Sequence, residues 1–285
     1  MIKIATLGPA GTYSDTATQR YVRKQSQVCE IHYFESIKLA LNAVGHGCDI
    51  GVLPVENFSE GFISLVLDHL LDSELSVVNE IRLPIQFSLV SRAAQLHAIK
   101  QLYVQFVAKG QCSEFLGSLG QVDIETTESN MESLQFAVLG GADTAAIVPS
   151  SAVKEGDFPL VIADVNDYKN NETRFLVFTK NSAVAQKIQD TEYKTSIIVM
   201  DENDRPGFLG EVLLSFSNRK INLTSIMSRP TKQTFGKYHF FIDFDGHVQD
   251  ANIAQALAEI AVNCKVKLLG SYPKIGDAEA RANAA

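Results

Sequence analysis

The chain has 285 residues, of which 46% are hydrophobic and 20% are charged. This length is typical of two domains, and the near-average composition excludes a disordered protein. The formal net charge of −8 at pH 7 excludes a broadly basic surface for nucleic acid, so an anionic ligand must be bound by local groups.

The cysteines and the N-terminus restrict the type of protein further. No Cys-x-x-Cys pair and no cluster at metal-ligand spacing occurs, so we expect reduced structural thiols and no metal. The N-terminal residues 1–11 lack the features of a signal peptide, and no run reaches the roughly 18 apolar residues of a membrane span. We therefore expect a cytoplasmic protein with no nucleic-acid or membrane partner. The four cysteines are Cys29, Cys48, Cys112 and Cys264.

Strand and helix patterns alternate in the first half of the chain, which favours a mainly parallel sheet. A second series begins near residue 77, and two final runs return towards the first. We predict a two-lobed α/β domain over 1–181, with lobe one at about 1–76 and 160–181, lobe two at about 77–159, and a binding cleft between them. In chain order, the expected strands are 2–8, 48–57, two runs within 76–92, 99–106, 122–127, 143–149, 161–165 and 173–180, and the expected helices are 14–24, 36–47, 61–73, 111–119 and 131–141.

A polar linker is expected at 181–194, and a strand-helix-strand-strand-helix-strand order follows it. Apolar residues recur at helical spacing in both helices, so both cover one face of an antiparallel sheet, as in ferredoxin-like folds. This predicts a small α+β sensor domain over 195–275 and a frayed tail after it. The expected strands are 195–200, 221–231, 237–244 and 265–272, and the expected helices are 206–220 and 252–264.

A Gly-rich turn over 8–14 joins the first strand to the first helix. Backbone N–H groups at such a helix start, together with the hydroxyls of Thr12 and Ser14, can bind a carboxylate or a phosphate. The Gly-x-x-Gly spacing excludes a dinucleotide fingerprint. The alternative is a tight turn in which Ser14 caps the helix.

The segment 54–57 ends a buried strand, where α/β folds place ligand-binding groups. Glu56 can orient a donor, and the amide of Asn57 offers both a donor and an acceptor to a polar substrate. The alternative is a helix cap formed by Asn57 and Ser59.

Two further motifs carry groups suited to binding. Arg174 has a permanent charge that can bind a carboxylate bidentately, with the Thr173 hydroxyl beside it; the alternative is a surface ion pair. In the small domain, Gly207 permits close backbone approach opposite the strand that ends at Arg229 and Pro230, so a small amino acid can bind there or across a dimer interface. The alternative there is that these residues only mark the start of the helix and the end of the strand.

Taken together, the motifs at 8–14, at 54–57 with Gly61, and at 173–175 resemble those of the prephenate dehydratases. The segments 207–209, 222–226, 228–230 and 238–243 resemble the ACT domain that follows the catalytic domain in that family and senses phenylalanine. The resemblance implies a periplasmic-binding-protein-like cleft domain and a βαββαβ ACT domain. It also implies conversion of prephenate to phenylpyruvate in phenylalanine biosynthesis, phenylalanine as allosteric effector, no cofactor, and a homodimer or homotetramer.

By this resemblance, Thr173 assists departure of the leaving hydroxyl, Arg174 holds a carboxylate and Phe175 shapes the ring pocket. The other expected substrate-binding residues are Thr12, Ser14, Glu56, Asn57, Ser129 and Asn130. The expected effector-binding residues are Gly207, Phe208, Leu209, Ser228, Arg229 and Pro230.

The chain also departs from the family's usual residues. Phe58 and Asn130-Met131 replace small or hydroxyl residues, and 105–108 replaces a His-Pro-Gln-Ala segment. Two alternatives therefore stay open: a catalytically silent binding or regulatory homologue, and a variant that decarboxylates prephenate without aromatising it. Met227 and Phe208 leave the identity of the effector open.

Overall fold

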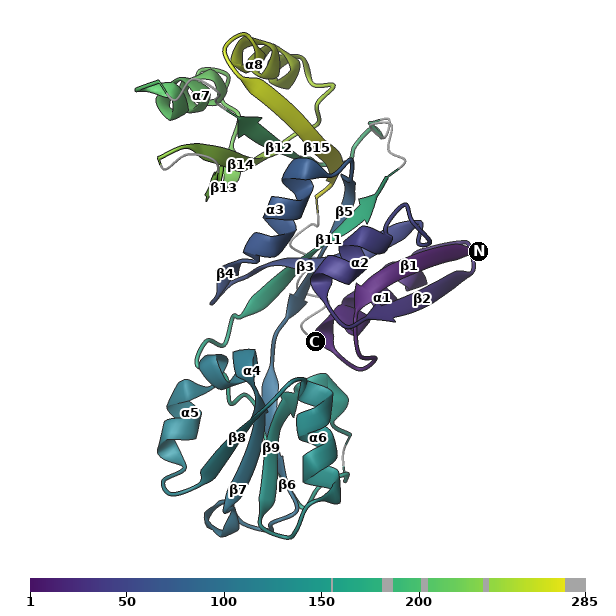
Figure 1. Ribbon diagram of the computed structural model, residues 1–285, viewed down its shortest axis with the longest axis vertical. Helices are drawn as coiled ribbons and strands as arrows, with labels where there is room; N and C mark the ends of the chain where they lie inside the picture. Colours follow the sequence, from purple (N-terminus) through teal and green to yellow (C-terminus); the bar gives the residue numbers. More distant parts are fainter. Residues whose placement is uncertain (155, 181–186, 201–204, 233–235, 275–285) are drawn as a thin grey trace.

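Three sheets follow one another along the molecule, which is elongated in Figure 1, with lobe one in the middle, lobe two at one end and the C-terminal domain at the other. This computed structural model describes residues 1–154, 156–180, 187–200, 205–232 and 236–274. The expected order of a two-lobed domain and a ferredoxin-like domain is confirmed. Residues 181–186 of the expected linker and the expected tail lie outside the described residues. Within the described part, no helix has the length and apolarity needed to span a bilayer.

Lobe one is a mixed sheet in the order β2-β1-β3-β11-β5, with β4 paired to β3. β1 runs parallel to β2 and β3, whereas β11 runs antiparallel to both β3 and β5. The expected parallel arrangement therefore holds only for the first three strands, because β11 re-enters the sheet from lobe two. The strands are β1 (Ile2–Leu7), β2 (Cys29–Phe34), β3 (Ile50–Asn57), β4 (Gly61–Phe62), β5 (Ser76–Pro84) and β11 (Glu172–Thr179), and the helices are α1 (Tyr13–Arg23), α2 (Ile37–Ala43) and α3 (Ser64–Asp72).

Two features of lobe one differ from the sequence prediction. β2 was missed, and its alternating polar residues leave it as a half-exposed edge strand. We expected lobe two to begin near residue 77, but β5 pairs with β11 over its whole length and so belongs to lobe one. The chain therefore crosses to lobe two after Pro84.

Lobe two has a smaller sheet in the order β10-β6-β9-β7-β8. β7 runs parallel to both β8 and β9, and β6 runs antiparallel to β9. The carboxyl end of β7 leads directly into α4. The carboxyl end of β8 leads through a short turn into α6. The strands are β6 (Phe87–Ser91), β7 (Gln101–Gln105), β8 (Asp123–Thr127), β9 (Thr144–Pro149) and β10 (Leu160–Ile162), the helices are α4 (Phe106–Gln111), α5 (Ser113–Ser118) and α6 (Asn130–Leu139), and the 3₁₀ turns are Leu96–Ala98 and Ser150–Ala152.

The C-terminal domain is an antiparallel sheet in the order β13-β14-β12-β15. Both helices pack on one face, where Phe208, Phe216 and Ile260 join the core that Ile197 and Ile242 form on the sheet. The predicted βαββαβ order is therefore confirmed. The strands are β12 (Tyr193–Met200), β13 (Leu223–Pro230), β14 (Tyr238–Asp245) and β15 (Lys265–Pro273), and the helices are α7 (Phe208–Ser217) and α8 (Ala251–Ala261).

The face of the C-terminal sheet that its helices leave uncovered packs against lobe one. A single apolar core includes Ile198, Phe241 and Leu269 from this sheet together with Leu70 and Val77 from lobe one. Burial of apolar surface on this scale makes the domain a fixed part of the molecule rather than a tethered module.

Two chain segments connect the lobes and are fixed by side chains. Asn166 accepts a hydrogen bond from the Phe87 N–H at 2.6 Å and donates to the Ile85 carbonyl at 3.0 Å. The Tyr13 hydroxyl bonds both the carbonyl and the N–H of Gln86. The start of α1 is therefore held against the crossing point of the two lobes.

Close backbone approach between β15 and β5 predicts that Gly270→Ala is destabilising. A Cβ at this position would lie 2.0 Å from the Val77 carbonyl oxygen, and backbone cannot yield as a flexible side chain can. We expect a loss of about 1–3 kcal/mol in the free energy of unfolding, measured by urea denaturation. The matched control is Gly117→Ala in α5, where a Cβ meets nothing within 4 Å and helix propensity improves. Equal stability of the two variants would contradict the packing.

Candidate active site

Alternation along β11 divides the predicted site residues between two faces of the lobe-one sheet. Thr173 lies opposite Asn57 on β3, whereas Arg174 lies opposite Glu56. Because successive side chains of a strand point to opposite faces, Thr173 and Asn57 share one face, and Arg174 and Glu56 share the other. The sequence places these residues together, but the fold separates them into two groups.

The first group is centred on the Thr173 hydroxyl. Asn57 Nδ2 donates to Thr173 Oγ1 at 2.9 Å and to the Glu172 carbonyl at 3.2 Å. Asn57 Oδ1 accepts from the N–H groups of Ser59 and Glu60, so the same residue also fixes the turn after β3. Since the hydroxyl oxygen of Thr173 accepts this bond, its hydrogen is available to another acceptor.

A chain of amides continues from Asn57 into lobe two. Gln111 at the end of α4 donates to Asn57 Oδ1 at 3.4 Å, and Asn171 donates to Gln111 Oε1 at 2.9 Å. All three amides are less than 9% exposed. The Thr173 group therefore includes residues from both lobes and lies where the lobes meet.

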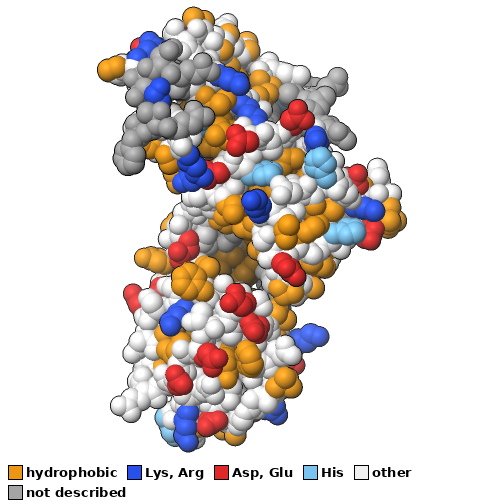
Figure 2. Space-filling model, in the orientation of Figure 1, with side chains coloured by type: hydrophobic (Ala, Val, Ile, Leu, Met, Phe, Trp, Pro, Cys, Tyr) orange, Lys and Arg blue, Asp and Glu red, His pale blue; other side chains and the backbone are white. Residues whose placement is uncertain are grey.

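The turn at 8–14 lies at the mouth of the cleft. Thr12, rather than Ser14, caps α1 by accepting from the Asp15 N–H, and Ser14 is buried beneath it. A Cβ on Gly11 would lie 3.0 Å from the sulfur of Met131, so this turn contacts the start of α6 across the cleft. Figure 2 shows a hollow with hydrophobic side chains at the waist between lobes one and two.

The wall contributed by lobe two begins with the cap of α6. Ser129 Oγ accepts from the Glu132 N–H at 3.1 Å, and Glu132 accepts in return from the Glu128 N–H at 2.8 Å. These bonds are similar to a capping box, except that Glu132 bonds the residue before the N-cap. Asn130 Oδ1 is buried and has no hydrogen-bond partner among the residues that the structure describes. The amino ends of α1 and α6 therefore meet from opposite lobes, and each carries a partial positive charge.

Arg174 belongs to a second group, on the face that packs against the C-terminal domain. Its Nε donates to Glu80 at 2.8 Å, Nη1 to Asp243 at 2.6 Å and Nη2 to the Tyr272 hydroxyl at 2.8 Å. Glu56 lies 3.6 Å from Nη1. All three nitrogens thus have protein partners, which differs from the expectation that Arg174 holds a substrate carboxylate. Strand alternation is the reason, because Arg174 is one residue away from Thr173.

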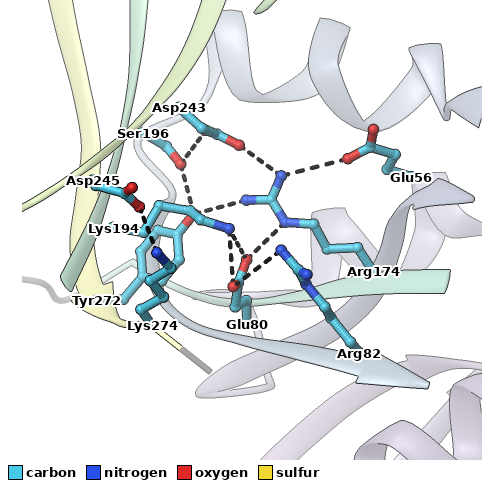
Figure 3. Close-up of polar contacts among 10 residues, drawn as sticks. All are labelled: Glu56, Glu80, Arg82, Arg174, Lys194, Ser196, Asp243, Asp245, Tyr272 and Lys274. Atoms are coloured by element: carbon cyan, nitrogen blue, oxygen red, sulfur yellow. Dashed lines mark hydrogen bonds and ion pairs between the residues drawn. The ribbon is translucent and has the colours of Figure 1, made fainter. Parts of the chain in front are cut away.

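Burial shapes the electrostatics of this second group, drawn in Figure 3. Lys194 Nζ lies 3.0 and 2.9 Å from the two oxygens of Glu80, whose side chain is fully buried. Burial lowers the pKa of Lys194, with the Arg174 charge adding to the shift and Glu80 opposing it. Although burial opposes it, the charges around Arg174, led by Asp243, raise its pKa well above the ordinary value.

The remaining expected cleft residues have defined positions. Phe175 is 1% exposed and lies in the core beneath α1 with Ile81 and Val177. The Gln105 side chain caps α4 by accepting from the N–H groups of Val107 and Ala108. Phe58 is 67% exposed in the turn after β3.

The expected effector residues fall into two places. Gly207, Phe208 and Leu209 line a cavity of about 250 Å³ together with Lys237 and Tyr238. Gly207 adopts a φ of 86°, a left-handed conformation that favours glycine at the start of α7.

The other effector segment, 228–230, lies on β13, where Ser228 pairs with Phe240 of the cavity wall. Arg229, however, forms a bidentate ion pair with Asp68 on α3, at 3.1 and 3.0 Å.

Several residues of both groups were not predicted from sequence. Gln111, the last residue of α4, and Asn171, in the turn before β11, are uncharged amides, and no sequence pattern separates them from ordinary caps. Glu80 gave a weak signal, since it is a carboxylate inside a run that was expected to form a strand. Among the described residues, no group of three His, Cys, Asp or Glu side chains is arranged to hold a metal ion.

Comparisons with known proteins agree with this arrangement. The prephenate dehydratase family matches residues 4–183, and the ACT domain family matches residues 196–262. A prephenate dehydratase of Methanocaldococcus jannaschii is 33% identical over 273 residues, covering 93% of this chain and 96% of that protein.

Two solved structures are similar to this chain over most of its length. The prephenate dehydratase of Arthrobacter aurescens in complex with L-Phe has a TM-score of 0.79 at 28% identity, covering 99% of this chain and 97% of that one. The prephenate dehydratase of Staphylococcus aureus Mu50 has a TM-score of 0.78 at 29% identity, covering 95% of this chain and 100% of that one.

Proposed function

Because the chain belongs to the prephenate dehydratase family, we propose that it converts prephenate to phenylpyruvate with loss of water and carbon dioxide. The observation that carries this proposal is the Thr173 hydroxyl, which accepts from Asn57 and keeps its hydrogen free at the meeting point of the lobes. The Arthrobacter relative was solved with L-Phe, which supports phenylalanine as the effector of the ACT domain.

The reaction needs one hydrogen bond at the departing hydroxyl. In prephenate the bond from the ring carboxylate to its carbon breaks and releases CO₂, and its electron pair forms the new ring double bond. The hydroxyl on the ring carbon across from the carboxylate leaves as water, after taking up one proton that comes from solvent. Thr173 donates the hydrogen bond that stabilises the departing oxygen, and acts as a donor or relay because a threonine hydroxyl is too weak an acid to supply the proton outright.

Two carboxylates must be held while this bond breaks. We assign them to the amino ends of α1 and α6, where helix dipoles and N–H groups favour negative charge. The Ser14 hydroxyl and the amide of Asn130 complete this polar wall, while the Thr12 hydroxyl, which donates to the Pro9 carbonyl, holds the turn in place. The Gly11 N–H is already bonded to the Asp15 carboxylate at 2.8 Å and the Asp15 N–H to the Thr12 hydroxyl at 3.3 Å, so the N–H groups of Tyr13 and Ser14 are the donors in this assignment.

Incubation of the purified full-length chain with prephenate tests the proposal. We expect phenylpyruvate, detected by its absorbance in alkali and by mass, at a rate that phenylalanine alters. A decarboxylated product that keeps the hydroxyl would favour the decarboxylase alternative. Binding of prephenate by calorimetry without any product would favour a silent homologue and refute the dehydratase.

We also propose that the ACT domain pairs with a second copy through β13. This strand is an edge of its sheet, whereas the other edge strand, β15, is packed against β5. Ile226 on β13 is 44% exposed, an apolar side chain in a position to be covered by a partner strand. We expect light scattering to give twice or four times the mass of the chain, and Ile226→Lys to lower it to that of one chain; a wild-type monomer would contradict this pairing.

A further inference from the structure

We propose that Asp243 and Tyr272 of the ACT domain are positioning residues for the reaction at Thr173, acting through Arg174. This inference rests on the proposed function and deepens it, because it names the contacts by which the sensor domain acts on the active site. It arises from the second side-chain group of the site, which the dehydration itself does not use.

The first step of the argument is the link along β11. Thr173 and Arg174 are consecutive, and a planar peptide fixes their Cα atoms 3.8 Å apart, so a displacement of one backbone position is passed to the other. The pairing of β11 with β3 shifts register between Arg174 and Phe175. A bulge interrupts the regular ladder of hydrogen bonds, so the contacts of the Arg174 side chain have more influence on the backbone here.

The second step is that both domains hold the Arg174 side chain. Glu80, from lobe one, binds Nε, whereas Asp243 on β14 and Tyr272 on β15 bind the two terminal nitrogens. Ser196 on β12 connects them, at 2.5 Å to Asp243 and 2.7 Å to the Tyr272 hydroxyl. Figure 3 shows the guanidinium between these groups. A guanidinium that is bonded through several nitrogens fixes both the distance and the orientation of its partners. These bonds therefore define the position of β11 relative to the ACT sheet.

The third step concerns charge. The ion-paired group contains three positive and three negative charges, of which Arg174, Lys194 and Glu80 are the most buried. Arg82 and Glu56 lie at its more exposed edge, and Asp243 completes it. Charges in such a place tolerate few alternative arrangements, because an unpaired one is costly. A rearrangement of the ACT strands that moves Asp243 must therefore either carry the Arg174 side chain with it or separate Nη1 from its closest anion. The first outcome shifts the backbone at Thr173, and the second removes a contact that fixes it.

A second ion cluster between the same domains provides the matched control. Asp68 on α3 pairs with Arg229 and Lys232 at the other side of the interface. This cluster is more exposed and does not involve β11. Asp68→Asn therefore perturbs domain contact without touching the link to Thr173.

The experiment compares Asp243→Asn, Tyr272→Phe and Asp68→Asn in the full-length protein. For Asp243→Asn we expect kcat for prephenate to fall about tenfold with little change in KM, since the cleft face that binds substrate is untouched. We expect phenylalanine to bind with wild-type affinity by calorimetry but to change kcat much less than in wild type. Tyr272→Phe should show the same pattern more weakly, and Asp68→Asn should keep the kcat measured without phenylalanine.

A readout without turnover keeps the inference separate from the proposed function. In the absence of ligands, we expect amide hydrogen exchange of a peptide spanning 172–176 to speed up in Asp243→Asn and not in Asp68→Asn. If the wild-type chain does not act on prephenate, the proposed function fails and this comparison still decides the positioning role. Equal exchange in the two variants, or an Asp243→Asn enzyme with a wild-type kcat and phenylalanine response, would overturn the inference.

Discussion

Replacing Thr173 by valine is expected to lower kcat for prephenate by about 10²–10⁴-fold, the range typical of a lost proton donor or relay. Valine keeps the shape of the side chain and removes only the hydroxyl. Stability should change by less than about 1 kcal/mol, because Asn57 Nδ2 keeps the Glu172 carbonyl as acceptor. Steady-state kinetics with phenylpyruvate detection, together with urea denaturation, measures both quantities.

Serine at the same position is the matched control. Thr173→Ser retains the hydroxyl in reach of Asn57 and should keep most of the activity, with a loss of at most about tenfold from the added rotational freedom of the side chain. If the valine variant turned over prephenate as fast as the serine variant, the hydroxyl would have no part in the chemistry and Thr173 would serve only to position Asn57.

Replacing Glu80 by glutamine is expected to destabilise the protein by about 3–5 kcal/mol, the cost of removing one partner from a buried ion pair. The change removes the ion-pair partner of Lys194 within the described part of the chain and leaves Arg174 with Asp243 as its closest anion. The urea midpoint of unfolding measures the effect. Asp68→Asn removes an anion from the more exposed cluster and should cost less than about 1 kcal/mol. A similar shift in the two variants would contradict the difference in burial.

Lys194 gives this variant a pH dependence with a defined sign. Its pKa is already lowered from 10.5 in the folded protein, and loss of Glu80 lowers it further. The unfolded chain then binds a proton that the folded chain binds more weakly, so stability rises with pH between the lowered folded value and 10.5. Glu80→Gln should therefore recover part of its stability relative to wild type as the pH rises toward 10.5, and Lys194→Met in the same background should remove that recovery.

Sequence reasoning predicted the layout of the fold because hydrophobic periodicity and turn residues are local signals. The βαββαβ order of the ACT domain and the alternation that builds lobe one both follow from such patterns. β2 escaped because an edge strand buries little and so lacks the apolar alternation of its neighbours. The start of lobe two was misplaced because β5 joins the lobe-one sheet only through its pairing with β11, far along the chain.

The site was predicted as a set of residues, but not as an arrangement. Thr173 and Arg174 are adjacent in sequence, and a shared motif suggests a shared role. Strand alternation gives them different faces, and only the fold reveals that the C-terminal domain covers one of these faces. The partners of Arg174 are Glu80, Asp243 and Tyr272. They lie too far from Arg174 along the chain for any local sequence pattern to connect them.

The central claim is that β11 carries the catalytic Thr173 on one face and the contact with the ACT domain on the other. A crystal structure with a stable dicarboxylate analogue of prephenate bound tests this claim most directly. The account predicts a ligand beside Thr173, with its carboxylates at the amino ends of α1 and α6, and Arg174 still bonded to Glu80 and Asp243. A structure in which the Arg174 guanidinium leaves those partners and binds a ligand carboxylate would contradict it.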